Sequence, residues 1–461
     1  MNVASKIDVM LINPYVYAPK TRMPPLGLLS IASILDGKGY NVKFIDMQIQ
    51  SPDEVKSALA DLREDGLVGF GGASEGRFIV FELSAVAKEM HPACTVVYGG
   101  PHASFTAEIT LKRMPSIDVV VIREGELTAS ELADCVLKKE DSLKQINGVA
   151  YRQDGYVAHN PPRPRISDLD ILDYRFDKFI GYNDYSQELL LGKGKSLHSI
   201  TSRGCFWRCS FCAASVLWDS QITGHSAKRI GGEIERLFQI VPDLKGVIFV
   251  DSIFTYDRQR VRNLCDEFDR RKLRFLWSCD IRANSVDYEL LARMRDSGCY
   301  SVSFGFESAS QRVLDVIKKK ATVNDAVKVF AWVTRLNMNT IVNVTYGHPT
   351  ETFDEALYSL NFIKDYLSDN VHMLDPQPMR VYPGTELESY AIEHNLLPEG
   401  FSWATYYNND PGLKRSTPFV PVLVQPQLGI DEFKALESEF SKISSAGSDA
   451  IFVDSKPQPS T

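Results

Sequence analysis

Strand-length apolar runs alternate with helical stretches along most of the chain, and this alternation limits the possible folds more than any other feature. The first part has expected strands at 7–13, 42–46, 68–71, 94–98 and 119–122 and expected helices at 26–35, 52–64, 78–90 and 129–137. Strands that alternate with helices form parallel sheets with right-handed crossovers. We therefore predict a doubly wound α/β domain of Rossmann type over residues 1–145.

The carboxyl ends of these expected strands carry four polar or glycine-rich loops, at 13–14, 71–74, 99–102 and 124–126. In a doubly wound sheet, ligands bind outside the carboxyl ends of the strands. Glycine there lets the backbone approach a bulky ligand, but it also forms ordinary tight turns. One such loop would decide nothing, whereas four together favour a ligand-binding edge.

A second alternating series begins near residue 196. Its expected strands are 198–201, 246–251, 275–280, 301–306, 340–346 and 373–380, and its expected helices include 231–239, 258–271, 288–297 and 323–336. Six βα units predict a partial (β/α)6 barrel over residues 196–395, with its active site at the carboxyl ends of the strands. Residues 146–195, with a short hairpin at 148–157 and a proline-rich stretch at 160–164, are expected to be a linker. Residues 396–461 form a small C-terminal extension.

Charge and hydropathy exclude two classes of partner. The chain has 51 Lys and Arg against 59 Asp and Glu, a net charge of −8, and no basic block. Nucleic-acid binders need a basic face to neutralise phosphates. The longest apolar runs are strand-length, far short of the ~20 residues of a membrane-spanning helix. The N-terminus also lacks the features of a secretory signal. We expect a cytoplasmic protein that binds neither nucleic acid nor membranes.

Three of the eight cysteines lie close together, directly after the first strand of the second series. They are Cys205, Cys209 and Cys212, in the segment TSRGCFWRCSFCAA. Three thiolates cannot complete a structural zinc site, and no fourth Cys or His follows at zinc-finger spacing. Three thiolates on a four-iron cluster leave one iron open. The triplet therefore favours a catalytic iron–sulfur cluster over structural zinc.

The spacing Cys205-x3-Cys209-x-Phe211-Cys212 resembles the signature of radical S-adenosylmethionine (SAM) enzymes. The resemblance extends through FVDSIF (249–254), SCDIR (278–282), FGFES (304–308), GHPTET (347–352) and YPGT (382–385). The N-terminal series is similar to the cobalamin-binding domain often fused ahead of this barrel, through PPLGL (24–28), GGPH (99–102) and REGE (123–126). Together these resemblances cover nearly the whole chain.

The resemblance implies a 4Fe–4S cluster on the three cysteines, with SAM bound to the open iron through its amino and carboxylate groups. One-electron reduction, by a carrier such as flavodoxin or ferredoxin, would cleave SAM to methionine and a 5′-deoxyadenosyl radical. That radical would abstract hydrogen from a small-molecule substrate. The cofactors carry this chemistry and the protein orients them.

The resemblance also implies roles for individual residues. Asp251 and Ser252 are placed to meet the amino group of SAM, and Arg282 its carboxylate, because a guanidinium offers a planar fork. Glu307 and Ser308 would contact the ribose. Ordinary ion pairs inside the barrel are the alternative for Arg282 and Glu307.

Further assignments are less specific. Phe211 would cover the cluster or the adenine, and simple core packing is its alternative. His348 is a candidate for proton transfer, with a structural role as the alternative. The aromatic segment 401–407 would cap the barrel mouth or form part of a core. Contacts to cobalamin are expected from seven residues of the N-terminal domain: Gly72, Ser74, Gly99, Gly100, Glu124, Gly125 and Glu126.

The chain lacks the Asp-x-His-x-x-Gly motif that supplies an axial histidine in many cobalamin proteins. Resembling enzymes often bind cobalamin without such a histidine, and His102 in the GGPH loop is not expected to replace it. We expect a cobalamin-dependent enzyme that methylates an unactivated carbon. The alternative is a radical cyclisation, rearrangement or dehydration, in which the N-terminal domain need not bind cobalamin. A cobalamin sensor is disfavoured because it would not need three cluster thiolates.

Overall fold

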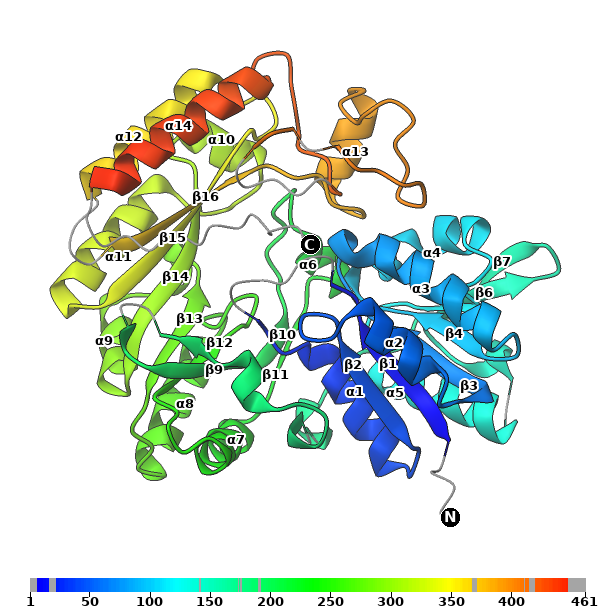
Figure 1. Ribbon diagram of the computed structural model, residues 1–461. Helices are drawn as coiled ribbons and strands as arrows, with labels where there is room; N and C mark the ends of the chain where they lie inside the picture. Colours follow the sequence, from blue (N-terminus) through cyan, green and yellow to red (C-terminus); the bar gives the residue numbers. More distant parts are fainter. Residues whose placement is uncertain are drawn as a thin grey trace. The chain divides into compact units, whose positions relative to one another are not determined.

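The computed structural model describes residues 6–15, 22–140, 142–172, 174, 176–189, 192–366, 371–409, 411–413 and 419–446. Within these residues the chain forms two compact units (Figure 1). The first consists of residues up to 185 together with 400–407, and the second of residues 186–399 and 408–446. Every helix in the described ranges is too short or too polar to cross a membrane.

The first unit is built on a seven-stranded sheet in the order β2-β1-β3-β4-β5-β6-β7. Five strands are parallel: β1 (Ile7–Asn13), β2 (Val42–Asp46), β3 (Leu62–Phe70), β4 (Thr95–Tyr98) and β5 (Val119–Val121). Its helices are α1 (Leu26–Gly37), α2 (Pro52–Leu59), α3 (Arg77–Met90), α4 (Pro101–Arg113) and α5 (Glu126–Ala133). The predicted doubly wound α/β class is confirmed.

Both faces of this sheet are buried, which explains its continuous apolar strands. Successive side chains of a strand point to opposite faces. Val9 and Leu11 pack into a core that includes residues of α1 and α5. Met10 and Ile12 pack into a second core, with residues of α2, α3 and α4. Each strand therefore needs apolar residues at consecutive positions and not only at alternate ones.

Two boundaries of the first unit differ from the sequence-based expectation. The expected helix 52–64 ends at Leu59, because residues from Leu62 onward pair with β1 as the start of β3. The expected linker 146–195 does not separate the units as free chain. Its predicted hairpin forms as β6 (Val149–Gln153) and β7 (Tyr156–His159), which extend the sheet antiparallel to β5. Proline content revealed the turns of this segment, but not the apolar side chains that it buries, such as Leu169 and Phe176.

The second unit is a curled sheet in the order β16-β15-β14-β13-β12-β9-β8. Six strands are parallel: β9 (Lys195–Ser199), β12 (Gly246–Phe249), β13 (Leu276–Ile281), β14 (Cys299–Glu307), β15 (Asn339–Tyr346) and β16 (Val371–Pro378). The short β8 (Gln187–Glu188) pairs antiparallel with β9. This half-barrel confirms the predicted six-stranded barrel class.

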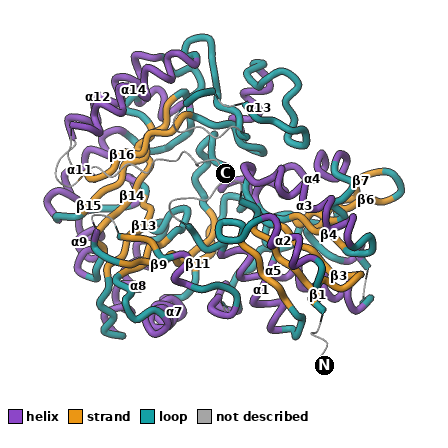
Figure 2. Tube along the Cα trace, in the orientation of Figure 1, coloured by secondary structure: helices purple, strands orange, loops and turns teal. Residues whose placement is uncertain are grey.

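Helices cover the outer side of the half-barrel (Figure 2). They are α7 (Ala227–Ile240), α8 (Arg258–Arg270), α9 (Tyr288–Asp296), α10 (Gln311–Val316), α11 (Val323–Leu336) and α12 (Phe353–Tyr366). The glycine pair at 231–232 lies inside α7, where the sequence predicts a helix. Two later helices, α13 (Glu386–Glu393) and α14 (Ile430–Ala446), belong to the same unit. The ring of Phe433 on α14 lies 5.5 Å from the ring of Tyr346 at the end of β15.

Candidate active site

The cysteine loop is closed at its base by a two-stranded ribbon that the sequence did not predict. Strand β10 (Ser202–Gly204) pairs antiparallel with β11 (Ile222–Gly224), and the short helix α6 (Ala213–Leu217) lies between them. Gly204 has a φ of +102°, and a Cβ at this position would lie 2.0 Å from the carbonyl oxygen of Gln221. Only glycine fits this turn, which directs the chain into the loop.

The middle of the loop is fixed to two other parts of the half-barrel. The amide of Ser210 donates to the carbonyl of Ile317 at 3.0 Å, and its own carbonyl accepts from the amide of Leu387 at 2.9 Å. The amide of Cys212 donates to the carbonyl of Cys209 at 3.1 Å, forming a tight turn. The loop therefore presents its thiols from a backbone that is already hydrogen-bonded.

The three thiols lie close enough to influence one another. The pKa of Cys212 is raised to about 11, mainly by burial and to a smaller extent by neighbouring Cys209 and Cys205. Within the described residues, no three His, Cys, Asp or Glu side chains converge on a single metal-ion position. In a four-iron cluster each thiolate binds a different iron, so the sulfurs do not share one point. The donor set thus fits a cluster and does not fit a lone ion.

Arg282 lies directly beside these thiols. Its guanidinium stacks on the ring of Trp207, with the central carbon 4.1 Å from the ring centroid, and Nη1 lies 3.6 Å from Sγ of Cys209. Nε donates to Asn284 at 3.0 Å, while the buried Nη2 has no partner in the described residues. No carboxylate pairs with Arg282 there, so the alternative of a barrel-interior ion pair finds no support. One planar donor remains available for a ligand carboxylate.

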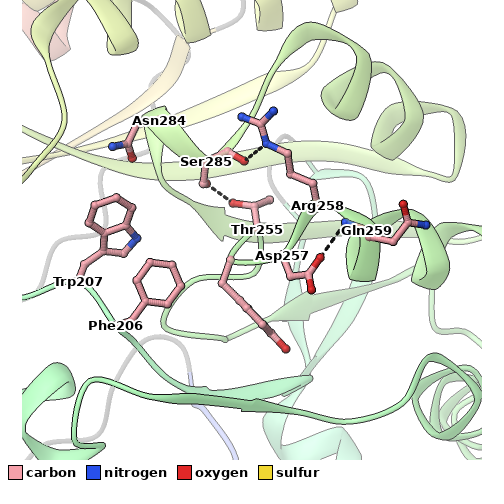
Figure 3. Close-up of a pocket in the computed structure, with 9 residues that line it drawn as sticks. Phe206, Trp207, Thr255, Asp257, Arg258, Gln259, Asn284 and Ser285 are labelled. Atoms are coloured by element: carbon pink, nitrogen blue, oxygen red, sulfur yellow. Dashed lines mark hydrogen bonds between the residues drawn. The ribbon is translucent and has the colours of Figure 1, made fainter.

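A pocket of about 570 Å³ opens beside the same loop (Figure 3). It is lined by Phe206, Trp207, Thr255, Tyr256, Asp257, Arg258, Gln259, Asn284 and Ser285. Asp257 caps the start of α8 by accepting from the amides of Gln259 and Arg260. Phe206 is 43% exposed, whereas the next residue, Trp207, covers Arg282. Trp207, which lines this pocket, stacks on Arg282, and Arg282 in turn contacts Cys209.

Asp251 and Ser252 follow β12, but their side chains have different surroundings. Asp251 is 1% exposed, and its carboxylate accepts from the amide and the hydroxyl of Thr201 at 3.1 and 2.8 Å. It also accepts from the hydroxyl of Ser202. Burial raises the pKa of Asp251. This carboxylate thus fixes the strand that leads into the cysteine loop, whereas Ser252 is exposed.

Glu307 is the last residue of β14 and lies at the centre of a buried network of polar side chains. Its carboxylate accepts from Nζ of Lys319 at 2.7 Å and from the hydroxyl of Thr345 at 2.8 Å. Burial alone would raise the pKa of Glu307, but the Lys319 ammonium outweighs it, and the pKa lies below its usual value. Glu307 is therefore ionised. Glu307 thus forms an ion pair inside the barrel, which was the alternative to a ribose contact. Lys319 lies near enough to Cys205 and Cys212 to oppose the rise in pKa that burial causes in both thiols.

Lys319 is the functional candidate that sequence reasoning missed. It lies in a run of three lysines, which is ordinarily a solvated surface. Lys318 and Lys320 both adopt left-handed φ values of +55°, and Lys319 between them is 8% exposed. These two turns direct only the middle lysine inward. The run was visible in the sequence, but its backbone conformation was not.

Phe211 and Ser308 have separate environments. Phe211 packs against the apolar cluster of Met379, Val381, Leu387, Ala391 and Leu423, and its ring centroid lies 6.1 Å from that of His348. The hydroxyl of Ser308 contacts the hydroxyl of Ser359 on α12 at 2.9 Å. Ser308 is therefore turned toward α12, whereas Glu307 is turned toward Lys319.

In the first unit, two predicted loops meet at the carboxyl edge of the parallel sheet. Gly72 and Gly100 have φ values of +153° and +96°, and a Cβ on Gly100 would lie 2.8 Å from the amide nitrogen of Gly72. Ser74 contacts Nδ1 of His102 at 2.9 Å. Nε2 of His102 and the hydroxyl of Tyr98 are buried without partners in the described residues. Close backbone approach and unsatisfied polar atoms at this edge fit a large ligand.

The remaining predicted residues of this edge are tied into the fold. Glu124 accepts from the amide of Ile166 at 2.9 Å, and Glu126 accepts from the hydroxyl of Ser30 at 3.0 Å. A Cβ on Gly125 would meet Ile31 at 2.9 Å, so its requirement for glycine comes from packing. A Cβ on Gly99 would make only ordinary contacts.

The aromatic segment 401–407 belongs to the first unit. The ring of Trp403 lies 5.6 Å from the ring of His102 and 5.2 Å from the guanidinium carbon of Arg77. The ring of Tyr406 lies 4.8 Å from that of Phe78. These contacts place the segment against α3 and α4, at the end of the helices that adjoins the glycine loops.

Comparison with known families accounts for both units. The family described as the B12 binding domain matches residues 12–133, and the radical SAM superfamily matches residues 199–363. An uncharacterized methyltransferase of Pyrococcus horikoshii is 31% identical over 398 residues, covering 86% of this chain and 84% of that protein. The anaerobic magnesium-protoporphyrin IX monomethyl ester cyclase of Rubrivivax gelatinosus is 28% identical over 367 residues, covering 77% and 65% of the two proteins.

A solved structure shares the fold of nearly the whole chain. It is the radical SAM methyltransferase TsrM from Kitasatospora setae, with cobalamin and a 4Fe–4S cluster bound. The TM-score is 0.73 with 18% sequence identity, and the match covers 93% of this chain and 90% of TsrM. At this identity the likeness establishes the fold alone.

Proposed function

The chain belongs to the radical SAM superfamily, in a branch with an N-terminal B12-binding domain, and we propose that it methylates an unactivated carbon of a small molecule. The observation that carries this proposal is the cysteine loop with Arg282 beside it, where a buried guanidinium nitrogen has no partner in the described residues. The relative from Pyrococcus horikoshii, a methyltransferase by name, matches over most of both chains and supports methyl transfer.

The second unit would bind the cluster and SAM. Cys205, Cys209 and Cys212 would hold the 4Fe–4S cluster, which supplies the electron that cleaves SAM. Arg282 would bind the carboxylate of SAM through the free edge of its guanidinium, and stacking on Trp207 restricts that guanidinium to one plane. Because Trp207 fixes the plane, little side-chain entropy is lost on binding.

The other residues predicted to contact SAM differ in how deeply they are buried, and this difference suggests separate roles. Glu307, already ionised beside Lys319, would accept from a ribose hydroxyl. Ser252 is exposed and would meet the amino group, while Asp251 would act by holding the strand before the loop. Phe211 would pack beside the cluster or the adenine. Ser308, which faces α12, is the weakest member of the predicted set.

The first unit would bind cobalamin at the loops that contain Gly72, Ser74 and Gly100. Cobalamin would serve as the carrier of the methyl group. Glycine at position 100 lets the two loops approach each other closely, and Ser74 with His102 provides polar atoms at the same edge. Gly99, Glu124, Gly125 and Glu126 would act by shaping this edge.

The electron would come from a one-electron carrier such as flavodoxin or ferredoxin. The pocket bordered by Phe206 and Trp207 supports this proposal, because Trp207 stacks on Arg282, which contacts Cys209, and Phe206 is exposed. None of the eight cysteines forms a disulfide in the described part of the chain. Cysteines that are not joined in disulfides are typical of a reducing compartment, which supports the cytoplasm as the location.

Two co-products of SAM test the reaction class. Donation of the methyl group leaves S-adenosylhomocysteine, whereas reductive cleavage leaves 5′-deoxyadenosine. The reconstituted protein would be incubated with hydroxocobalamin, a chemical reductant, SAM deuterated in its methyl group and a small-molecule extract of the source cells. We expect both co-products, together with one deuterated product in the extract. Formation of 5′-deoxyadenosine alone would instead favour cyclisation or rearrangement.

Matched cysteine variants identify the source of the activity. Cys209→Ala removes the thiol beside Arg282, and we expect neither co-product and a loss of iron. Cys94→Ala removes a buried thiol of the first unit that lies outside the cysteine loop. We expect this control to retain its iron and both co-products.

A further inference from the structure

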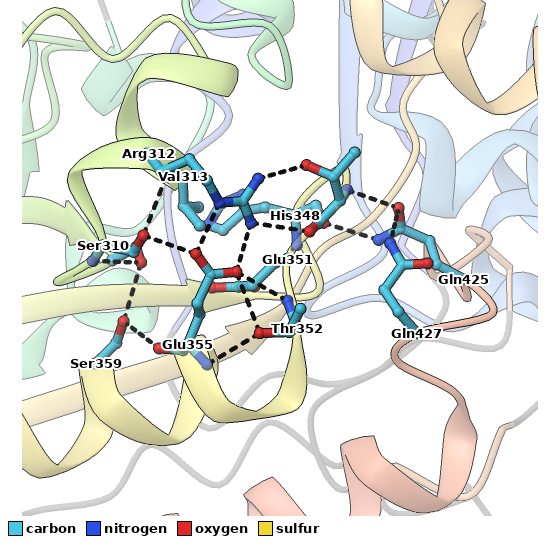
Figure 4. A network of polar contacts seen from close by, with 12 residues as sticks. Ser310, Arg312, Val313, His348, Glu351, Thr352, Glu355, Ser359, Gln425 and Gln427 are labelled. Atoms are coloured by element: carbon cyan, nitrogen blue, oxygen red, sulfur yellow. Dashed lines mark hydrogen bonds and ion pairs between the residues drawn. The ribbon is translucent and has the colours of Figure 1, made fainter.

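The loop between β15 and α12 has an unusual backbone and is held on both sides. Gly347 and Thr350 adopt left-handed φ values of +86° and +61°. A threonine rarely adopts this conformation, because its branched side chain crowds the backbone. Arg312 donates to the hydroxyl and the carbonyl of Thr350, at 2.9 Å each, on one side of the loop (Figure 4). Such a conformation persists only where its surroundings hold it.

The loop places His348 beside the network of polar side chains around Glu307. Nε2 of His348 lies 2.9 Å from the hydroxyl of Thr345, and that hydroxyl lies 2.8 Å from the Glu307 carboxylate. Because Glu307 is ionised, it can only accept, so the single hydroxyl proton of Thr345 goes to Glu307. His348 must therefore donate through Nε2. Nδ1 is buried without a partner in the described part of the chain.

A glutamine from the C-terminal extension holds the other side of this loop. Gln425 is 3% exposed, and its Nε2 donates to the carbonyl of His348 at 2.8 Å and to that of Gly347 at 3.4 Å (Figure 4). Its Oε1 accepts from the amide of Thr350 at 3.0 Å. Among uncharged side chains, only a carboxamide offers both a double donor and an acceptor for this arrangement.

The same extension also reaches the loop through an aromatic ring. A Cβ on Gly347 would lie 2.4 Å from the ring of Phe433 on α14. The hydroxyl of Tyr390 and the amide of Gln427 both approach Oε1 of Gln425, at 3.4 and 3.2 Å. Gln425 is therefore itself fixed by neighbours, and it holds the loop at three positions, Gly347, His348 and Thr350.

We propose that Gln425 is a positioning residue for the SAM site, and that the C-terminal extension completes that site through the loop carrying His348. This inference rests on the proposed function, because Glu307 is expected to contact the ribose of SAM. With Gln425 in place, the hydrogen bonds that join His348, Thr345 and Glu307 have one arrangement. Without Gln425, the strained backbone at Thr350 relaxes, and the Glu307 carboxylate loses its fixed orientation.

The test replaces Gln425 by a side chain of similar length that cannot form these hydrogen bonds. Gln425→Met should raise KM for SAM about tenfold, since three hydrogen bonds to the loop are lost. The kcat for dithionite-driven cleavage to 5′-deoxyadenosine should change much less. The electron paramagnetic resonance spectrum of the reduced cluster, measured without SAM, should match the wild type, and the change caused by adding SAM should require a higher SAM concentration.

A second variant keeps the test decisive even if the first one does not fold. Tyr390→Phe removes only the hydroxyl that supports Gln425, and a smaller rise in KM for SAM is expected. If Gln425→Met fails to keep its iron, Tyr390→Phe decides, and an unchanged KM then overturns the proposal. Wild-type KM in an iron-replete Gln425→Met variant also overturns it. A wild-type protein that does not cleave SAM would instead refute the proposed function.

Discussion

Two buried cations border the cysteine thiols, and they differ in what they leave available. Lys319 is committed to Glu307 through an ion pair of 2.7 Å. Arg282 is held flat against Trp207 and keeps one nitrogen unpartnered within the described residues. A guanidinium binds a carboxylate through two parallel hydrogen bonds, which an ammonium cannot do. We therefore expect SAM binding to depend on the planar shape of Arg282 as well as on its charge.

Arg282→Lys tests this dependence, because it keeps the positive charge and loses the planar fork. We expect KM for SAM to rise roughly tenfold while the iron content stays at the wild-type level. Arg295→Lys is the matched control, since Arg295 pairs with Asp296 on the surface. Steady-state cleavage of SAM and iron analysis of both variants provide the measurement. An unchanged KM in Arg282→Lys would remove Arg282 from the SAM site.

Glu351, in the loop that carries His348, makes stability depend on pH. Burial raises the pKa of Glu351 to about 8, although the amides of His348 and Gly347 donate to its carboxylate and oppose that shift. The folded protein thus holds a proton that the unfolded chain releases near pH 4.5. The stabilisation that comes from holding this proton is fully present below the pKa of the unfolded chain. It is lost as the pH rises through the pKa of the folded protein.

Glu351→Gln should flatten this dependence. The free energy of unfolding of the wild type is expected to fall by a few kcal/mol between about pH 5 and pH 8, and that of the variant by less. Denaturant titrations at several pH values measure both slopes. Glu54→Gln is the control, because Glu54 is fully exposed and its pKa is lowered by its hydrogen bonds to Ser51. Equal slopes in wild type and Glu351→Gln would exclude the buried proton.

At the level of elements, the sequence predicts the long parallel strands well and short antiparallel ribbons poorly. Each strand of the half-barrel is rich in apolar residues because it is buried, and these apolar runs locate the strands in the sequence. The ribbon of β10 and β11 has only three residues on each side, and its pairing depends on the turn at Gly204. Such short pairings are set by tertiary contacts and leave no periodic signal in the sequence.

The aromatic segment 401–407 shows the same limit. Its composition left two interpretations open, and the structure places Trp403 against His102 and Arg77 of the first unit. Aromatic residues bury large areas wherever they pack, so composition alone could not say against which element. A segment far along the chain thereby becomes part of the N-terminal unit.

Trp403→Ala measures what this segment contributes. Trp403 is 8% exposed, and its removal should lower the stability of the first unit by roughly 3 kcal/mol. Trp403→Phe keeps an aromatic ring and should cost less than half as much. Hydrogen exchange of the amides in β1 and β3 reports the first unit separately from the second. Unchanged protection in Trp403→Ala would show that the segment is not part of that core.

The molecule as a whole contains two sheets of mainly parallel strands, each with candidate ligand contacts at the carboxyl ends of those strands. In the first unit these contacts come from the loops after β3 and β4, and in the second from the cysteine loop, Arg282 and Glu307. The sequence could locate both edges, since glycines and cysteines stand directly after the strands. It could not locate Lys319 or Gln425, whose roles depend on backbone conformation and on contacts between segments far apart in the chain.

The central claim is that one chain binds both a four-iron cluster and cobalamin. It is tested most directly by anaerobic reconstitution with iron, sulfide and hydroxocobalamin, followed by desalting and metal analysis. We predict about four irons and one cobalt per chain, with the iron but not the cobalt lost in Cys209→Ala. Four irons without cobalt would contradict cobalamin-dependent methylation, and an iron-free protein would contradict the cluster itself.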